Sequence, residues 1–434
     1  MQKLKITATG DSLFVADIPE EYGSDMKTVS SYIAKGEIRI TNLETNISKF
    51  GDYPGAYSGG TWLNVEPNVF DDLTRYGFNF YGTANNHCMD YSYHGMLSTI
   101  DELDKRGLFH SGTGRSLVEA SAPAIIDTDG GRVAIFAVDT SFVDASKAGF
   151  ETKHHKARPG VNYLGKHTYV PIDEESVNAL RRIAAQTNIN ARRELRIQGG
   201  FDLADPDGIF DFGGIKFCYD GSKRRTECNK RDLERIIADV TRAKEKYGNV
   251  IMLVHCHDIG KTKHEEVPEY LEEFAHALID AGVCAVIGAG THQLRPLEIY
   301  KGAPIFYSLG DFIYQGMRVP YLPADFMIKY GVDINAPAYD GLMARSKGGK
   351  IGLQAEKCNF ESVIPYMEFE NGKLTLLQMM PIVAGFDREG KMNGLPYHAT
   401  GAECDNIFRV LSGLSEPYGT RLTLENNIIS LALD

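Results

Sequence analysis

The sequence contains neither a long hydrophobic run nor a paired cysteine motif. No stretch approaches the roughly 20 apolar residues that a helix needs to cross a bilayer, and the N-terminal residues lack the apolar segment of a secretory signal. The seven cysteines are odd in number and scattered, without a Cys-x-x-Cys pair. We therefore expect mostly reduced cysteines, a cytoplasmic location and no stable membrane insertion.

Positive charge is also scarce. The chain has 46 Lys and Arg against 58 Asp and Glu, which gives a formal net charge of -12. Because nucleic-acid binding depends on clustered basic residues that neutralise phosphates, this balance argues against a nucleic-acid partner. With 434 residues, of which 43% are hydrophobic, the chain is long enough for one large core or two domains.

Short β-branched or aromatic runs alternate with amphipathic segments along the chain. The pattern predicts strands at residues 4–9, 38–43, 78–84, 133–138, 250–255 and 283–288, and helices at 231–247 and 268–281. Strands alternating with helices of this length indicate an α/β fold in which at least part of the sheet is parallel.

Polar residues collect where these strands end, and the carboxyl ends of strands in α/β sheets are the usual place for a ligand crevice. Asp, Glu, Asn and His suit Zn, Mn, Fe or Mg, and a bridging carboxylate such as Glu44 is suited to hold two ions for phosphoester chemistry. The five strand ends carry Gly10-Asp11, Asn42-Leu43-Glu44, Asn85-Asn86-His87, His255-Cys256-His257 and the stretch IGAGTHQLRP at 287–296.

Two regions interrupt the alternation. An insertion at about 166–228 has its own helical piece at 176–186, and a loop-rich stretch covers 318–357. The runs at 364–369 and 373–380 flank Asn371-Gly372, a strong signal for a two-residue hairpin. We expect a core at 1–315 that contains the insertion, followed by a C-terminal region at 316–434 with loops, a hairpin and a helix packed on the core.

Several stretches together resemble the CapA family, named for poly-γ-glutamate capsule synthesis and similar in fold to calcineurin-like metallophosphoesterases. The resemblance implies a layered α/β sandwich of mixed sheets flanked by helices. It covers residues 4–165 and 229–315, and the tail from about 361 resembles the family's closing strands and helix. The matching stretches are TGDSLF, ITNLETNIS, TANNHCMDYSYHGM, HSGTGR, ARPGVNYL, the first histidine of LVHCHD, and THQLRPLEIYKGAPIFYSLGDFIYQ.

The resemblance also implies roles for individual residues in a site for one or two divalent ions. Asp11 and His292 correspond to ligands of the first ion, Glu44 to the bridging carboxylate, and Asn86 and His255 to ligands of the second ion. His87 matches the histidine that contacts the substrate oxyanion or protonates the leaving group. Asp90 either orients His87 or caps the helix that begins near Tyr91.

The sequence departs from the family pattern at two positions. Gly290 stands where the family usually shows a histidine, and His255-Cys256-His257 stands where it shows His-Trp-Gly. Three interpretations are open. His257 replaces the missing ligand, since residues i and i+2 of a strand share a face; or Gly290 leaves a coordination position for water or substrate; or the second ion site is lost.

We expect the substrate to be a small or oligomeric anionic molecule. A basic cluster either binds this anion or is simply a solvated surface; it consists of Lys153, His155, Lys156 and Arg158. The leading hypothesis is a metal-dependent hydrolase of a phosphoester or γ-glutamyl amide that uses a metal-bound hydroxide, with His87 and Asp90 at the reacting bond. The alternative is a non-catalytic accessory protein of polyglutamate or capsule metabolism whose metal site is degraded.

Overall fold

Two β-sheets form the centre of the protein, whose computed structural model describes residues 3–223 and 225–432. The first sheet has the order β24-β25-β22-β21-β1-β2-β5-β6, with β20 added beside β1 and β23 beside β22. Its strands are β1 (Lys3–Leu13), β2 (Ile38–Leu43), β5 (Phe80–Gly82), β6 (Phe109–Ser111), β20 (Asp311–Tyr314), β21 (Glu361–Glu370), β22 (Lys373–Val383), β23 (Tyr397–His398), β24 (Leu422–Glu425) and β25 (Ile428–Leu431).

The second sheet has the order β18-β19-β17-β16-β9-β8. Strands β9, β16, β17 and β19 are parallel, as are β1, β2, β5 and β6 of the first sheet. The edge strands β8 and β18 of the second sheet run antiparallel to their neighbours, and so do β21, β22, β25 and β24 of the first sheet. Its strands are β8 (Ala124–Thr128), β9 (Gly131–Asp139), β16 (Asn249–His255), β17 (Ala285–Ala289), β18 (Leu297–Tyr300) and β19 (Ala303–Phe306).

Side chains alternate between the two faces of each sheet, which creates three buried layers. In β9, Ile135 faces the core between the sheets, whereas Phe136 faces the core under α7 and α8. In β1, Ile6 belongs to the core between the sheets, and a further core lies beneath α1 and α2 on the first sheet. The main helices are α1 (Gly23–Ile33), α2 (Pro67–Thr74), α3 (Ser92–Lys105), α7 (Lys230–Tyr247), α8 (Glu269–Asp280) and α11 (Ala402–Ser415).

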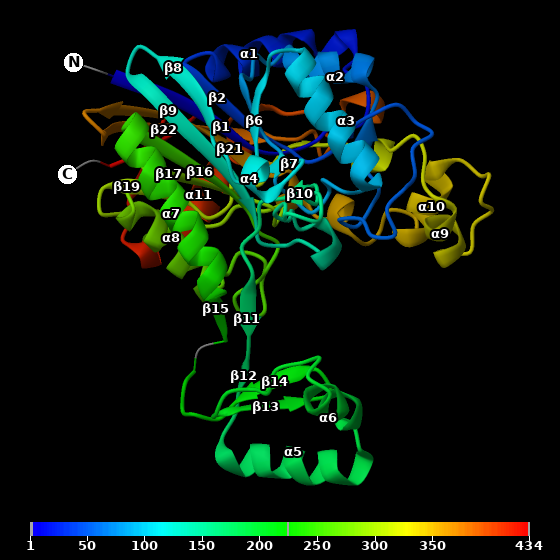
Figure 1. The fold of residues 1–434 in the computed structure, drawn as a ribbon. Helices are drawn as coiled ribbons and strands as arrows, with labels where there is room; N and C mark the ends of the chain where they lie inside the picture. Colours follow the sequence, from blue (N-terminus) through cyan, green and yellow to red (C-terminus); the bar gives the residue numbers. More distant parts are fainter. Residues whose placement is uncertain (1–2, 224, 433–434) are drawn as a thin grey trace.

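A smaller lobe projects from this body on the two-stranded stem formed by β11 (Lys166–Thr168) and β15 (Thr226–Cys228), as the lower part of Figure 1 shows. The lobe contains a three-stranded sheet covered by two helices. These elements are β12 (Val170–Pro171), β13 (Ile209–Phe212), β14 (Ile215–Cys218), α5 (Glu174–Thr187) and α6 (Ala191–Gln198). The expected division of the chain into domains stays a prediction.

The remaining elements are short and lie in the connections. They include α9 and α10 at the right edge of Figure 1, in the stretch expected to be rich in loops. Their bounds are β3 (Asn46–Ile47), β4 (Asn64–Val65), β7 (Thr113–Gly114), β10 (Gly160–Val161), α4 (Leu117–Ala120), α9 (Ala324–Lys329) and α10 (Ala338–Arg345).

The predicted fold class is confirmed: mixed sheets are layered on each other and flanked by helices. The predicted hairpin is also present, because β21 and β22 pair in an antiparallel manner around Asn371 and Gly372, whose φ angles are 52° and 77°. Positive φ at both central residues is what such a two-residue turn requires. Among the described residues, all seven cysteines are free thiols, and the helices there are too short or too polar to cross a bilayer.

We expect Gly10→Ala to destabilise the fold by about 1–3 kcal/mol, a typical result of inserting a methyl group into a packed region. A Cβ atom at Gly10 would lie 1.7 Å from the carbonyl oxygen of Gly310, next to Asp11. Urea unfolding measures the change. The control is Gly413→Ala on α11, where a Cβ meets no atom within 4 Å and where alanine favours the helix; equal stability of the two variants would contradict the close packing.

Candidate metal centre

The predicted strand ends from both sheets meet in one buried cluster. Asp11 of β1 pairs in register with Asn42 of β2, and its Oδ2 accepts a hydrogen bond of 2.7 Å from the amide of Gly290, which follows β17. On the second sheet, His255 at the end of β16 is the neighbour of Asp139 on β9. The carboxyl ends of the parallel strands therefore form the crevice expected from the sequence.

Glu44 lies at the centre of the cluster. It is fully buried, and neither carboxylate oxygen has a hydrogen-bond partner among the described residues. Three imidazoles surround its Oε1, with the Nε2 atoms of His255, His257 and His87 at 3.4, 3.7 and 3.8 Å. Burial raises the pKa of Glu44 well above its usual value, and the charge of Asp11 raises it further. Such a carboxylate is unstable as an anion unless a cation compensates it.

Two groups of ligand atoms share Glu44. The first consists of Asp11, Glu44 and His292, and the second of Glu44, His255 and His257; within each group the ligand atoms lie within 4.8 Å of one another. This arrangement gives Glu44 the place expected for a bridging ligand. Asp11 and His292 fall in one group and His255 in the other, as the family resemblance implies, and His257 joins His255 as the first of the three interpretations expects.

Asn86 joins the second group through its side-chain oxygen. The Oδ1 atom of Asn86 lies 2.8 Å from Nε2 of His255, whose Nδ1 atom lies 3.2 Å from the amide of Asn42. Asn42 also donates a 2.6 Å hydrogen bond to Asp11. The side-chain amide of Asn42 therefore contacts Nδ1 of His255, and Nε2 of the same ring faces Asn86 and Glu44.

His87 is held by Asp90, and Asp90 does not cap the following helix. The Nδ1 atom of His87 lies 2.6 Å from Oδ2 of Asp90. Asp90 also accepts hydrogen bonds from the amides of Leu63 (2.7 Å) and Gly59 (3.1 Å), whereas α3 begins at Ser92 without a side-chain cap. Of the two interpretations of Asp90, the structure therefore contains the contact that orients His87.

His292 has a similar partner in Asp311, the first residue of β20. Its Nδ1 atom lies 3.0 and 3.1 Å from the two carboxylate oxygens of Asp311. Burial lowers the pKa of His292, but the charge and hydrogen bond of Asp311 together with the charge of Asp11 outweigh this effect and leave that pKa raised. Because Nδ1 is occupied, Nε2 is the nitrogen available to an ion, which is the usual arrangement for metal-binding histidines backed by a carboxylate.

The backbone at Gly290 has no room for a side chain. A Cβ atom there would lie 2.7–2.8 Å from the backbone of Cys256, and φ is +115°. His257 lies beside His255 and His292 instead, with ring centroids 4.8 and 5.2 Å away. Although β16 ends at His255, the imidazole of His257 still reaches Glu44, and its buried Nε2 has no hydrogen-bond partner among the described residues.

Arg295 fixes the segment that carries His257. This arginine is 1% exposed and donates hydrogen bonds to the backbone oxygens of Asp258 and His264. The amide of His257 itself donates a 2.7 Å hydrogen bond to Oγ of Ser141. Hydrogen bonds within the protein therefore hold the segment after β16.

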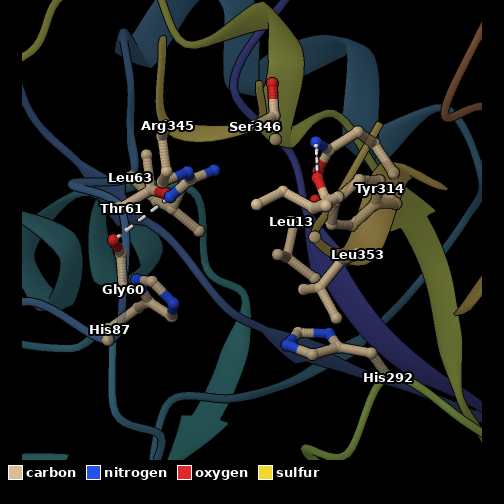
Figure 2. A pocket seen from close by; sticks show the side chains of 15 residues that line it. Leu13, Gly60, Thr61, Leu63, His87, His292, Tyr314, Arg345, Ser346 and Leu353 are labelled. Atoms are coloured by element: carbon tan, nitrogen blue, oxygen red, sulfur yellow. Dashed lines mark hydrogen bonds between the residues drawn. The ribbon is translucent and has the colours of Figure 1, made fainter. Parts of the chain in front are cut away.

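A pocket of about 330 Å³ opens above the cluster and has His87 and His292 in its wall (Figure 2). The basic cluster expected to bind substrate does not line it: Lys153, His155 and Lys156 are exposed, and the guanidinium of Arg158 donates to the carbonyl of Lys147. A role for these four residues in substrate binding stays a prediction.

Sequence reasoning missed two buried carboxylates in the cluster. Asp139 directly follows the predicted strand 133–138, the same signal that identified the other ligands, and one of its oxygens has no partner among the described residues. Asp311 lies within a stretch that carried the family resemblance, where no role was assigned to it. Burial raises the pKa of each to about 6.

The layered sheets and this cluster define an α/β protein with a candidate site for divalent cations. Residues 5–316 match the family described as "Bacterial capsule synthesis protein PGA_cap". The match covers most of the chain, and the protein belongs to this family.

Similar proteins extend the comparison to nearly the full length. The chain is 32% identical over 437 residues to the "Uncharacterized protein y4sH" of Sinorhizobium fredii (strain NBRC 101917 / NGR234), covering 98% of this chain and 92% of that protein, and equally similar to y4uA of the same strain. It is 25% identical to the "PGA biosynthesis protein CapA" of Bacillus subtilis (strain 168), over 69% of this chain and 60% of that protein.

We expect that Gly290→His does not restore the family's usual ligand. The backbone of Cys256 excludes the new Cβ, so the variant loses about 1–3 kcal/mol of stability without gaining metal. Chemical unfolding and elemental analysis measure the two effects. Gly51→His is the matched control, because its φ of +119° is similar but no atom lies within 4 Å of a Cβ there. If both variants lose the same stability, the clash with Cys256 is not the cause.

Proposed function

We propose that the protein is a metal-dependent hydrolase of a phosphoester or a γ-glutamyl-type amide. The observation that carries this proposal is the carboxylate of Glu44, which is fully buried with both oxygens unpartnered among the described residues while three imidazole nitrogens face it. Hydrogen bonds satisfy most buried polar groups in proteins. An unpartnered carboxylate shared by two ligand groups fits a bridge between two cations.

The donor set supports the same proposal. Carboxylate, imidazole and amide oxygens suit Mn, Zn, Fe or Mg. We propose that Asp11, Glu44 and His292 hold one ion, and that a second group, formed by Glu44, Asn86, His255 and His257, holds another. Bound divalent ions polarise substrate oxygens and lower the pKa of water, so that a nucleophile forms near neutral pH.

The role proposed for His87 is to protonate the leaving group. Its Nδ1 is committed to Asp90 at 2.6 Å, so Nε2 is the atom that can carry a transferable proton. Burial raises the pKa of Asp90, although the neighbouring His87 opposes this effect. A carboxylate in this position fixes the tautomer of the ring and stabilises the imidazolium, and His87 lines the pocket above the cluster.

Family membership suggests where such a reaction would be used. The relative from Bacillus subtilis carries a name that places it in PGA biosynthesis, which favours an amide or a phosphorylated precursor of a capsule polymer as substrate. A proton on Nε2 of His87 suits both cases, because an alkoxide and an amine each need a proton on leaving.

We expect His257→Ala to lower the metal content of the purified protein by about one ion per chain, since it removes one of the few ligands of the second group. Elemental analysis after growth in metal-replete medium measures the change. His264→Ala is the control, because this exposed histidine lies in the same segment and should leave the content unchanged. Full metal content in His257→Ala would show that His257 is not a metal ligand. A wild-type protein that contains no metal would contradict a metal-dependent hydrolase.

We expect His87→Gln to keep its metal and to lose about 10²–10⁴-fold in kcat, the usual contribution of general acid catalysis. The loss should be larger for a phosphodiester with a phenol leaving group than for one with 4-nitrophenol, because the poorer leaving group depends more on protonation. The control is His94→Gln, whose side chain is 71% exposed. A loss that is equal for both esters would rule out the proton-donor role.

The accessory function is the second candidate, and the absence of a side chain at Gly290 favours it. With a degraded metal site, the accessory function predicts no turnover of phosphodiesters or γ-glutamyl anilides. The presence of His257 in the second ligand group is the observation that places this candidate behind hydrolysis.

A further inference from the structure

The pocket above the metal cluster has two unlike walls. On one side the polar side chains of Thr61, His87 and Arg345 lie with Leu63, and on the other side Leu13 and Leu353 lie with Tyr314, as Figure 2 shows. His87 and His292 mark the end of the pocket nearest the cluster. A molecule that reaches the cluster through this space therefore passes between a polar and an apolar surface.

Arg345, the last residue of α10, is the only permanently charged residue among those described that line the pocket. No Asp or Glu belongs to this lining, although the chain as a whole has a net charge of -12. Arg345 thus supplies a fixed positive charge in the wall of this pocket. A fixed cation in a partly enclosed pocket attracts anionic groups.

The guanidinium of Arg345 is held in place, but only some of its hydrogen-bond donors have partners. Its Nη1 atom donates to Oγ1 of Thr61 (2.5 Å) and to the carbonyl of Gly60 (3.3 Å), and the guanidinium carbon lies 5.5 Å from the ring centroid of Phe326. Within the described part of the chain, Arg345 forms no ion pair, and its Nε and Nη2 atoms form no hydrogen bond. These donors are available for a bidentate contact with a carboxylate or phosphate.

We propose that Arg345 is a specificity-determining residue that binds an acidic group of the substrate remote from the bond that is cleaved, with the substrate's short apolar segment against Leu13 and Leu353. The inference rests on the proposed hydrolase function. It narrows the substrate class to compact molecules with an anionic end, a carboxylate or a phosphate, separated by an aliphatic spacer from the ester or amide. A volume of about 330 Å³ is at the small end for ligand pockets.

Turnover tests this inference with a matched pair of amides. Glutaryl 4-nitroanilide carries a terminal carboxylate, and butyryl 4-nitroanilide lacks it. Arg345→Met keeps an unbranched side chain beside Phe326 and should lower the ratio of kcat/KM for the glutaryl over the butyryl amide by about 10- to 100-fold, the effect of losing a hydrogen-bonded charge contact. Arg345→Lys should lower it less. Arg132→Met, at a surface ion pair with Asp127, is the control.

Equilibrium binding supplies a readout that does not depend on turnover. Glutarate should bind the metal-loaded protein more tightly than butyrate, and Arg345→Met should remove the difference; 4-phosphonobutyrate binding more tightly than glutarate would assign a phosphate, and the reverse a carboxylate. Thr61→Val, which removes the acceptor that aims the guanidinium, should reduce the preference if Arg345→Met fails to fold.

The outcomes separate the two proposals. Glutarate binding that depends on Arg345, without turnover of either the 4-nitroanilides or the phosphodiesters, would overturn the hydrolase and keep the anion site. Turnover with the same preference in wild type and Arg345→Met, together with equal binding of glutarate and butyrate, would overturn the role of Arg345 and keep the hydrolase.

Discussion

A carboxylate without hydrogen bonds is costly to bury, and Glu44 is buried with both oxygens in this state among the described residues. Four other carboxylates, Asp11, Asp90, Asp139 and Asp311, are also fully buried and raise the pKa of Glu44 through their charges. Their partners are mainly imidazoles and amides rather than Lys or Arg. The surrounding strand ends thus concentrate acidic groups, which favours the proposed binding of cations there.

The close pairing of the ends of β16 and β17 in the second sheet accounts for a glycine, rather than the histidine of the family pattern, at position 290. The amide of Gly290 binds Asp11, and the Cys256 backbone fills the space where a side chain at Gly290 would begin. A histidine side chain cannot be accommodated at position 290 while the backbone of Cys256 stays in contact with it. Another imidazole comes from the segment after β16. Arg295 and Ser141 hold the backbone of this segment so that His257 reaches Glu44.

The local signals in the sequence predicted several of the elements and most residues of the cluster, whereas elements such as α1 and β8 were not predicted. Residues 38–43 form β2 as predicted, and α7 and α8 begin and end within one residue of the predicted bounds. Asp11, Glu44 and His255 meet because parallel strands place their carboxyl ends at one edge. The contacts of His292 with Asp311 and of Arg345 with Thr61 join residues far apart in the chain or in loops, and no periodicity reports such contacts.

The proposed chemistry and the proposed selectivity would be carried by different parts of the molecule. The cluster rests on strand ends and on hydrogen bonds that cross between the sheets, so its geometry is fixed by the core. The polar wall of the pocket depends on α10 and on the loop at Gly60 and Thr61, which lie outside both sheets. Changes in these connections can alter which molecule is admitted without disturbing the packing that brings Asp11, Glu44 and His255 together.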